Sequence, residues 1–359
     1  MIKRRKTRTV LIGNVRIGAG HPVAIQSMTN TDTRDVKATV AQIKKLEKAG
    51  CDIVRVAVRD MGSALAIKKI KERIRIPLVA DIHFSPSLAL AAIENRADKI
   101  RINPGNIQDK ARLAEVIARA KTRGTPIRIG INSGSLPKEV TSHKKAAGGM
   151  CRAALKYIDF FEKCKFSNIV VSLKSSDVPS MIAAYRELST KTDVPLHLGV
   201  TSAGLPMDGI VKSSVGIGSL LCDGIGDTVR VSITGDPLIE IDAAKRILLA
   251  SGRRSFGPEL IACPSCGRCQ VDIVRITEEV DRELQKFVNR HPKLKEKHQI
   301  IAVMGCEVNG PGEAKQADIG IAFGKNRGAI FEGGKIVKVV EVKNAVKELL
   351  SRIMKGVHE

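Results

Sequence analysis

The sequence has no tryptophan, only two tyrosines and eight phenylalanines, and no run of 18 apolar residues. Because a membrane-spanning helix needs about 20 apolar residues in succession, we expect none. Few aromatic side chains are available for stacking on nucleic-acid bases. The basic start of the chain lacks the apolar stretch and the small-residue cleavage site of a secretory signal peptide. These absences predict a cytoplasmic protein that binds neither nucleic acid nor membrane.

Positive charge is abundant and unevenly distributed. The formal net charge is +23, but residues 256–359 hold 17 Lys and Arg against 14 Asp and Glu, which leaves +20 on the first 255 residues. A strong positive charge favours anionic partners, and its excess belongs to the N-terminal part of the chain. Apolar residues make up 43% of the 359, which is ample for a core and excludes a disordered chain.

The first 255 residues alternate between short β-branched runs and amphipathic helical patterns. Fully apolar runs are typical of strands buried on both faces, as in parallel sheets. Eight strands with intervening helices over about 250 residues predict a TIM (β/α)8 barrel, with a doubly wound open sheet as the alternative. The expected strands lie near Val23–Gln26, Ile53–Val58, Leu78–Ile82, Lys99–Ile102, Ile127–Ile131, Ile169–Leu173, Leu196–Val200 and Thr228–Ile233. The expected helices begin near Thr33 or lie near Ser63–Lys71, Pro86–Glu94, Lys110–Arg123, Ala147–Cys164, Val178–Thr190 and Leu238–Ala250.

Periodicity stops at residues 251–258, SGRRSFGP, where glycine and proline cluster. This break predicts a domain boundary, with a barrel over residues 1–255 and a small α+β domain over residues 256–359. The elements expected in the second domain are a helix near Val271–Asn289, strands at Gln299–Val303 and Asp318–Ala322, a hairpin around Gly333-Gly334 and a helix over Val342–Met354.

Four arginines stand between aliphatic residues inside the expected strands: Arg55, Arg101, Arg128 and Arg230. A buried charge without a partner is costly, so each arginine needs one. Guanidinium groups match phosphate oxygens, and four converging arginines predict a pocket for a doubly charged or diphosphate ligand. The alternative is a set of internal ion pairs with acids such as Asp52, Asp81, Asp98 and Asp227.

Polar residues also follow the expected strands, at the end where barrel enzymes carry their chemistry. Lys174 is suited to contact phosphate or to act as an acid. Each of these residues also suits a turn or a helix cap, and His83 suits a structural role. They are Asp81 and His83 after the third strand, Asn103 after the fourth, Asn132 after the fifth, Lys174 after the sixth and Thr201-Ser202 after the seventh.

Four of the eight cysteines belong to two motifs, Cys263-Pro-Ser-Cys266-Gly-Arg-Cys269 and the glycine-rich loop that begins at Cys306. In a reducing compartment such a group indicates a metal site rather than disulfides. A zinc ribbon requires a second C-x2-C pair about 15–20 residues further on, which is missing, so an iron–sulfur cluster and zinc both remain open. Glu313 ends the loop, and a carboxylate is a labile ligand for a soft cluster iron, able to yield its place to a substrate oxygen.

Four segments together resemble the 4-hydroxy-3-methylbut-2-enyl diphosphate synthase family of the non-mevalonate isoprenoid pathway, in its shorter two-domain bacterial form. The resemblance extends over nearly the whole chain. The segments are Cys263–Arg268 (CPSCGR), Gly305–Glu313 (GCEVNGPGE), Gly224–Ser232 (GIGDTVRVS) and Arg101–Asn106 (RINPGN).

The resemblance implies a reductive ring opening of 2-C-methyl-D-erythritol 2,4-cyclodiphosphate by two electrons, with loss of water. It implies a barrel that binds this cyclic diphosphate, a second domain that carries a [4Fe–4S] cluster, ferredoxin or flavodoxin as electron donor, and a homodimer in which one chain's cluster domain closes over the other chain's barrel. The implied cluster ligands are Cys263, Cys266, Cys306 and Glu313. The implied diphosphate contacts are Arg55, Arg101, Arg128, Asn132 and Lys174, to which we add Asn103 and Arg230. Catalytic roles are expected for Glu313, Asp81 and Lys174.

Two positions depart from the family pattern. Cys269 is a third thiol in the first motif, and we expect it to be a bystander. Ser202 stands where the family usually has glutamate, so a proton that the glutamate would supply must come from Glu313, Asp81 or water.

Two other functions are compatible with parts of the sequence. Basic charge together with the C-P-x-C-G motif is compatible with a zinc-knuckle nucleic-acid-binding protein. Phosphate-binding arginines together with Lys174 are compatible with an aldolase-like barrel that forms a Schiff base.

Overall fold

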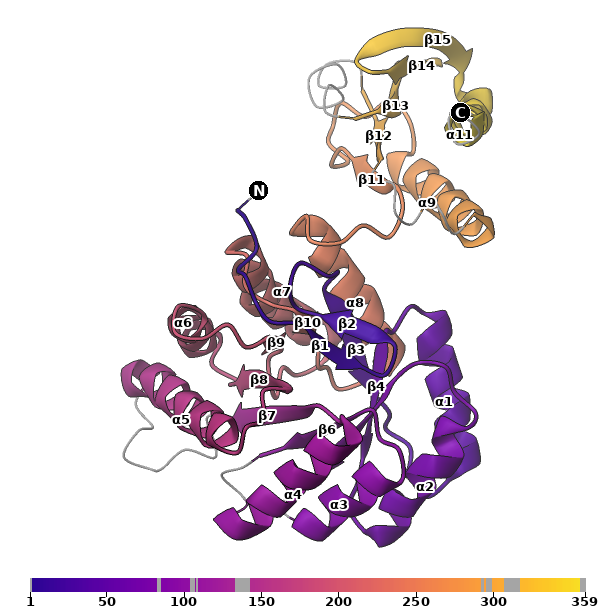
Figure 1. Ribbon diagram of the computed structural model, residues 1–359. Coiled ribbons are helices and arrows are strands. Elements are labelled where there is room, and N and C mark those ends of the chain that lie inside the picture. Colours follow the sequence, from indigo (N-terminus) through magenta and orange to yellow (C-terminus); the bar gives the residue numbers. More distant parts are fainter. Residues whose placement is uncertain are drawn as a thin grey trace. The chain divides into compact units, whose positions relative to one another are not determined.

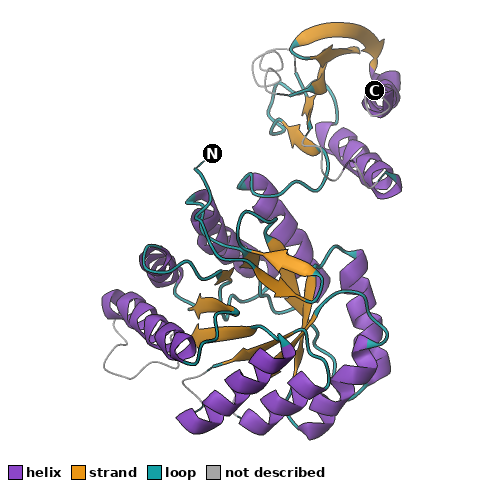
Figure 2. Cartoon of the chain, in the orientation of Figure 1, coloured by secondary structure: helices purple, strands orange, loops and turns teal. Residues whose placement is uncertain are grey.

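The computed structural model describes residues 2–82, 85–103, 107, 109–132, 143–291, 294, 299–306 and 317–355. The chain divides into two compact units, Met1–Arg254 and Ser255–Glu359. Figures 1 and 2 show the helices and strands of each unit. In the described part of the chain, no helix is long and apolar enough to cross a membrane.

The first unit is built on a parallel sheet. Its strands are β3 (Ala24–Met28), β4 (Ile53–Ala57), β5 (Leu78–Ile82), β6 (Lys99–Ile102), β7 (Ile127–Asn132), β8 (Ile169–Lys174), β9 (His197–Leu198) and β10 (Thr228–Val229). They pair in the order β8-β7-β6-β5-β4-β3-β10-β9. A parallel bridge between Val171 of β8 and Leu196, just before β9, joins the two ends of the sheet. The sheet therefore closes on itself, and the predicted (β/α)8 barrel is confirmed.

Helices lie around the outside of these strands (Figure 1). They are α1 (Val36–Lys48), α2 (Met61–Lys71), α3 (Pro86–Glu94), α4 (Lys110–Arg123), α5 (His143–Lys163), α6 (Val178–Ser189), α7 (Pro206–Cys222) and α8 (Pro237–Ala250). An aspartate begins several of them and accepts a hydrogen bond from a backbone N–H of the first turn, as Asp35 does for α1 and Asp60 for α2.

The sequence did not predict α7, because its glycines and serines have low helix propensity. Packing explains why the helix forms despite them. A Cβ added at Gly216 would lie 2.8 Å from Met181 and 3.0 Å from Val200, so only glycine lets this helix approach so closely. Burial against α6 and the barrel thus overrides local propensity.

A hairpin packs against the starts of the barrel strands. Its strands, β1 (Val10–Ile12) and β2 (Val15–Ile17), pair in antiparallel fashion. One buried apolar cluster joins the hairpin to residues near the starts of β3, β4, β5 and β8: Val10, Ile12, Ile17, Ala24, Ile53, Val79 and Val170. The sequence did not predict this hairpin, because three-residue strands give almost no periodic signal.

The apolar cluster fixes which strand residues point inward. Side chains alternate along a strand, so Arg55 points the same way as Ile53, and Asp81 the same way as Val79. The hairpin therefore covers the N-terminal end of the barrel with apolar side chains. Charged side chains occupy the end from which the βα loops emerge, where barrel enzymes carry their sites.

The second unit is a small α+β fold, as predicted. Its strands are β11 (Glu259–Ala262), β12 (Ile300–Met304), β13 (Ile319–Phe323), β14 (Arg327–Glu332) and β15 (Lys335–Glu341), paired in this order. The first three are parallel, and the last two are antiparallel. The helices α9 (Ile273–Arg290) and α11 (Val342–Lys355) share one apolar core with this sheet. The sequence missed β11, a four-residue strand whose side chains are only partly buried or exposed.

The hairpin gives a test of the fold. We expect Ile12→Ala to lower the free energy of unfolding by about 2–4 kcal/mol, because it leaves a cavity in a fully buried cluster. Leu11 lies on the same strand but is 51% exposed, so Leu11→Ala serves as control, with a change below about 0.5 kcal/mol. Denaturant unfolding followed by circular dichroism measures both variants. Equal losses would show that the hairpin does not close the barrel.

Candidate active site

Charged side chains line the interior of the barrel, most of them toward the carboxyl ends of the strands, with Lys99 deeper at the start of β6. In the described residues, six cations face two carboxylates, and all but Arg230 are buried. The cations are Arg55, Lys99, Arg101, Arg128, Lys174 and Arg230, and the carboxylates are Asp81 and Glu240. This excess of positive charge, enclosed by a barrel wall, is the principal feature of the site.

Asp81 links two of the arginines. Neighbouring strands place Asp81, Arg101 and Arg128 at one level, because their Cα atoms pair across β5, β6 and β7. The Asp81 carboxylate lies 3.1 Å from Arg101 Nη1 and 3.7 Å from Arg55 Nε. Two guanidinium groups thus share one carboxylate, and a net positive charge remains.

Glu240 reaches the site from α8 and holds Arg230. Its Oε1 lies 3.1 Å from Arg230 Nη2. Its Oε2 accepts a hydrogen bond of 2.8 Å from Ser27 Oγ of β3. The sequence analysis missed Glu240 because it lies on a helix rather than at a strand end; its only signal was a carboxylate within an apolar stretch.

Of the four arginines, Arg128 is the one that forms no ion pair with an acid of the described residues. It is 1% exposed, and among the described residues its Nε and Nη1 have no hydrogen-bond partner. Burial lowers the pKa of Arg128, and the neighbouring Arg55 and Arg101 lower it further. An orphaned guanidinium in a closed barrel indicates a position for an anion.

The alternative of four internal ion pairs is correct only in part. Asp81 does pair with Arg55 and Arg101, as that alternative required. The remaining acids are engaged elsewhere, and they pair with residues outside the set of four: Asp52 with Arg254, Asp98 with Lys71, and Asp227 with Arg4.

Lys174 ends β8 beside these arginines. Burial lowers the pKa of Lys174 well below its ordinary value, and Arg128 and Arg55 lower it further. Glycines make room for the cations: a Cβ at Gly199 would lie 2.8 Å from Lys174 Nζ, and one at Gly130 would lie 2.6 Å from Arg101 Nε. The absence of side chains at Gly130 of β7 and at Gly199, directly after β9, lets the cations converge.

A deeper polar layer was not predicted from the sequence. Lys99 Nζ lies 3.4 Å from Gln26 Oε1. His197 Nδ1 lies 2.8 Å from Thr228 Oγ1, while its Nε2 has no partner among the described residues. Burial lowers the pKa of His197, and so does Arg128. The sequence did contain a signal for this layer, because Lys99 and His197 are polar residues next to buried aliphatic residues in their strands.

The remaining predicted residues fall at the strand ends or outside the described residues. Asn103 is buried directly after β6, and Asn132, the last residue of β7, pairs in register with Lys174. Ser202 is exposed and has a φ of +51°. His83 and Glu313 lie outside the described residues.

The cysteines of the second unit gather at one sheet edge. Cys263 directly follows β11, and Cys306 follows β12 by two residues; because these strands are parallel, their carboxyl ends meet. The Gly305 N–H donates a 3.1 Å hydrogen bond to Cys263 Sγ. Burial raises the pKa of the Cys263 thiol, and the thiols of Cys269 and Cys306 also raise it. A Cβ at Gly305 would lie 2.7 Å from Cys269 Sγ, so glycine is required there.

The donor chemistry of this edge fits a soft metal centre. Thiolates are the ligands of iron–sulfur clusters, and a backbone N–H directed at a ligating sulfur tunes such a centre. Among the residues that are described, no three His, Cys, Asp or Glu side chains converge into a metal site. The fit therefore rests on the thiol set and on the hydrogen bond from Gly305.

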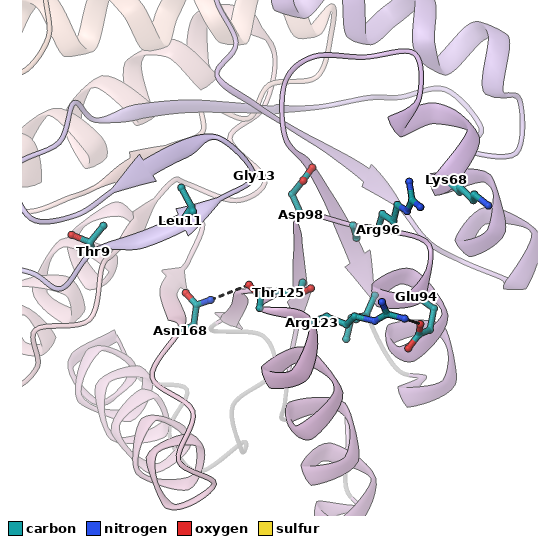
Figure 3. Close-up of a pocket in the computed structure, with 13 residues that line it drawn as sticks. Thr9, Leu11, Gly13, Lys68, Glu94, Arg96, Asp98, Arg123, Thr125 and Asn168 are labelled. Carbon is teal, nitrogen blue, oxygen red and sulfur yellow. Dashed lines mark hydrogen bonds and ion pairs between the residues drawn. The ribbon is translucent and has the colours of Figure 1, made fainter.

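A separate hollow of about 840 Å³ lies near the starts of the barrel strands, beside the hairpin (Figure 3). Its acids already have partners, since Glu94 pairs with Arg119 and Arg123, and Asp98 with Lys71. It therefore lacks the uncompensated buried charge found at the other end of the barrel.

Two family models match almost the whole chain. Residues 7–245 match the GcpE TIM-barrel domain, and residues 259–355 match the GcpE protein C-terminal domain. The chain belongs to the GcpE family. The predicted resemblance is thereby confirmed.

Relatives of this GcpE protein are similar over their full length. One, from Caldanaerobacter subterraneus, is 52% identical over 100% of both chains, and another, from Clostridium perfringens, is 51% identical over 98% of this chain and 99% of the relative. Both are named 4-hydroxy-3-methylbut-2-en-1-yl diphosphate synthase (flavodoxin). A solved dihydropteroate synthase from Coxiella burnetii covers 68% of this chain and 99% of its own, with a TM-score of 0.51 at 14% identity, which shows the barrel fold alone. Nothing in these matches supports the zinc-knuckle alternative.

The orphaned arginine predicts an unusual pair of effects. We expect Arg128→Met to raise the free energy of unfolding of the ligand-free protein by about 1–3 kcal/mol, because an apolar side chain replaces an unpaired buried charge. The same variant should bind sulfate at least about tenfold more weakly, because a charge-assisted contact is lost. Thermal unfolding and calorimetry measure the two effects.

Arg123→Met is the control for this pair, because Arg123 is half exposed on α4 and its loss should change both quantities little. A strongly destabilised Arg128→Met variant would mean that the fold itself compensates the charge.

Proposed function

We propose that this chain reduces 2-C-methyl-D-erythritol 2,4-cyclodiphosphate to (E)-4-hydroxy-3-methylbut-2-enyl diphosphate. The observation that carries the proposal is the buried excess of cations around Arg128. Each phosphorus of the cyclic diphosphate forms one ester and one anhydride link, which leaves one ionised oxygen on each, so the ligand carries two negative charges. The names of the relatives at about half identity support the same reaction.

The charge balance of this reaction explains why the cations are needed. The dianion takes up two electrons and one proton, and it leaves as a trianion and one water molecule. Breaking the carbon–oxygen bond of the ring therefore adds a negative charge to the diphosphate. Guanidinium groups fixed in a dry barrel stabilise charge that develops there, without having to reorganise.

The barrel residues receive roles from their contacts. Arg55, Arg101 and Arg128 bind the phosphates, with Arg230, Asn103 and Asn132 as further substrate contacts. Asp81 pairs with Arg55 and Arg101, so it positions these two guanidinium groups. Lys174 has no acidic partner among the described residues. We propose that the bound dianion raises the pKa of its amine, which is then protonated and donates the proton to the departing oxygen. Lys174 would then supply the proton in place of the glutamate that the family usually has at the position of Ser202.

The second unit would hold the [4Fe–4S] cluster. Cys263, Cys266 and Cys306 supply three thiolates, and Glu313 is the proposed fourth ligand and the proposed catalytic group next to the iron. When bound, the cluster supplies the two electrons one at a time. Cys269, adjacent to Gly305, is proposed as a bystander.

Flavodoxin is the electron donor that we propose, because the relatives carry it in their names. Flavodoxin and ferredoxin are acidic, and the net charge of +23 favours an acidic partner. All eight cysteines are free in the structure. Free thiols and a cluster suit a reducing compartment, so we place the protein in the cytoplasm.

One face of the barrel unit suits a homodimer. An exposed apolar stripe begins at the residue before α7 and continues along this helix. It consists of Leu205, Met207, Val211 and Val215. An apolar hollow of about 480 Å³ lies beside it, between α7 and α8. Asp242 and Arg246 flank this hollow on α8 and carry opposite charges. A symmetric dimer contacts the same patch on both copies, so it needs a self-complementary surface of this kind. We propose a second copy of this chain as the occupant.

Metal content and turnover test the reductase. We expect anaerobically purified protein to hold about four iron and four sulfide per chain. Cys306→Ala should lose both, together with turnover of the cyclic diphosphate, while Cys222→Ala, an exposed cysteine of α7, should keep them. One zinc per chain without sulfide would overturn the proposal, and borohydride trapping of substrate on Lys174 would favour the aldolase-like reaction.

The dimer face has its own test. We expect Val211→Glu to raise the dissociation constant of the dimer at least about tenfold, because a charge is buried in an apolar contact. Light scattering after size-exclusion chromatography measures the mass. Leu65→Glu introduces the same charge at a comparably exposed position of α2 and should leave the dimer intact. A dimer unaffected by Val211→Glu would place the interface on another face.

A further inference from the structure

Lys99 is a buried basic residue of the barrel that the proposed reaction does not use. Its side chain is fully buried at the start of β6. Its Nζ has one hydrogen bond in the described part of the chain, of 3.4 Å to Gln26 Oε1. No carboxylate of the described residues forms an ion pair with it.

Neither carboxylate of the barrel interior is available to neutralise Lys99. Asp81 is shared between Arg55 and Arg101. Glu240 binds Arg230 and Ser27. The charges that act on Lys99 are instead the guanidinium groups of Arg128 on β7 and Arg55 on β4, and both lower its pKa.

The surroundings therefore oppose a charge on Lys99 from every side. Burial lowers the pKa of Lys99 well below its ordinary value, and Arg128 and Arg55 lower it further. His197 of β9 is buried and neutral for the same reasons, Gln26 of β3 is uncharged, and Lys174 of β8 is another buried amine whose pKa is lowered. An unpaired ammonium ion in such a space gives up its proton.

A bound dianion reverses this balance. Two negative charges beside Arg128 compensate the guanidinium groups and attract a further positive charge through a medium of low dielectric constant. The amine of Lys99 is a neutral buried base within the electrostatic reach of Arg128, and a proton from water restores its charge. No covalent bond to the ligand is involved.

We propose that Lys99 is a proton-accepting group of the anion site, uncharged while the barrel is empty and protonated when a dianion binds beside Arg128. The proposal deepens the function proposed above and rests on it for the identity of the natural dianion. Lys99 acts through Arg128 and is a positioning residue, which adjusts the charge of the site to that of its ligand.

Linkage fixes the sign of the pH dependence. A ligand whose binding takes up a proton binds more weakly as the pH rises, by about tenfold per pH unit for one proton. Sulfate and the cyclic diphosphate both keep a charge of −2 near neutral pH, so a proton that is taken up belongs to the protein. The affinity for either ligand should therefore fall with rising pH.

Calorimetry on the oxidised, cluster-containing full chain tests the proposal, since no turnover occurs without a reductant. Sulfate and the cyclic diphosphate are titrated separately in two buffers that differ in ionisation enthalpy, at several pH values. Lys99→Met is compared with Lys121→Met, an exposed lysine of α4. We expect Lys99→Met to lose about one proton of the uptake seen in the wild type and to flatten the pH dependence, while Lys121→Met changes neither.

The outcomes separate this proposal from the proposed function. Wild-type binding of both dianions without buffer-dependent heat overturns the role of Lys99 and leaves the anion site intact. Unchanged uptake in Lys99→Met has the same meaning, because the proton then goes to another group. Failure of the wild type to bind either dianion overturns both. If Lys99→Met does not fold, Lys99→Gln takes its place, and unchanged proton uptake in that variant overturns the role of Lys99.

Discussion

The chemistry of the barrel depends on one electrostatic constraint, namely that cations outnumber carboxylates in a buried space. Asp81 and Glu240 compensate part of this charge by pairing with Arg55, Arg101 and Arg230. Arg128 forms no ion pair within the described part of the chain, and two of its guanidinium nitrogens lack a hydrogen bond there, so its burial lowers the stability of the ligand-free fold. Affinity for a dianion thus arises from a charge imbalance that the ligand-free fold tolerates.

Parallel strands make both parts of the proposed machinery possible. In the first unit, neighbouring strands bring Asp81, Arg101 and Arg128 to one level. In the second unit, β11 and β12 bring Cys263 and Cys306 to one edge. Each arrangement also requires glycines at contact points, because a Cβ at Gly130 or Gly305 would collide with the functional side chain beside it.

The sequence predicted what periodicity and local context determine. Each of the eight barrel strands lies where apolar runs were found, and the arginines within them do point to one interior. The hairpin β1–β2, helix α7 and the residues Lys99, His197 and Glu240 were missed. Their positions depend on tertiary packing: a short hairpin closing a barrel, a glycine-rich helix held by its neighbours, and side chains whose partners are distant in sequence. Asp81 shows why the sequence alone could not decide between ion pairs and an anion pocket. It forms ion pairs with Arg55 and Arg101, and the same two arginines belong to the proposed anion site.

The ion pairs at the ends of the first unit have a consequence for folding. Arg4 pairs with Asp227, and Arg254 pairs with Asp52, while β3 pairs with β10. These ion pairs and the strand pairing hold the first and last segments of the barrel together, although roughly 200 residues separate the two members of each ion pair in the sequence. Contacts between such distant residues form late and slowly. During synthesis the barrel therefore stays open until its last helix has left the ribosome, and its arginines spend that time in water rather than in the interior that they later fill.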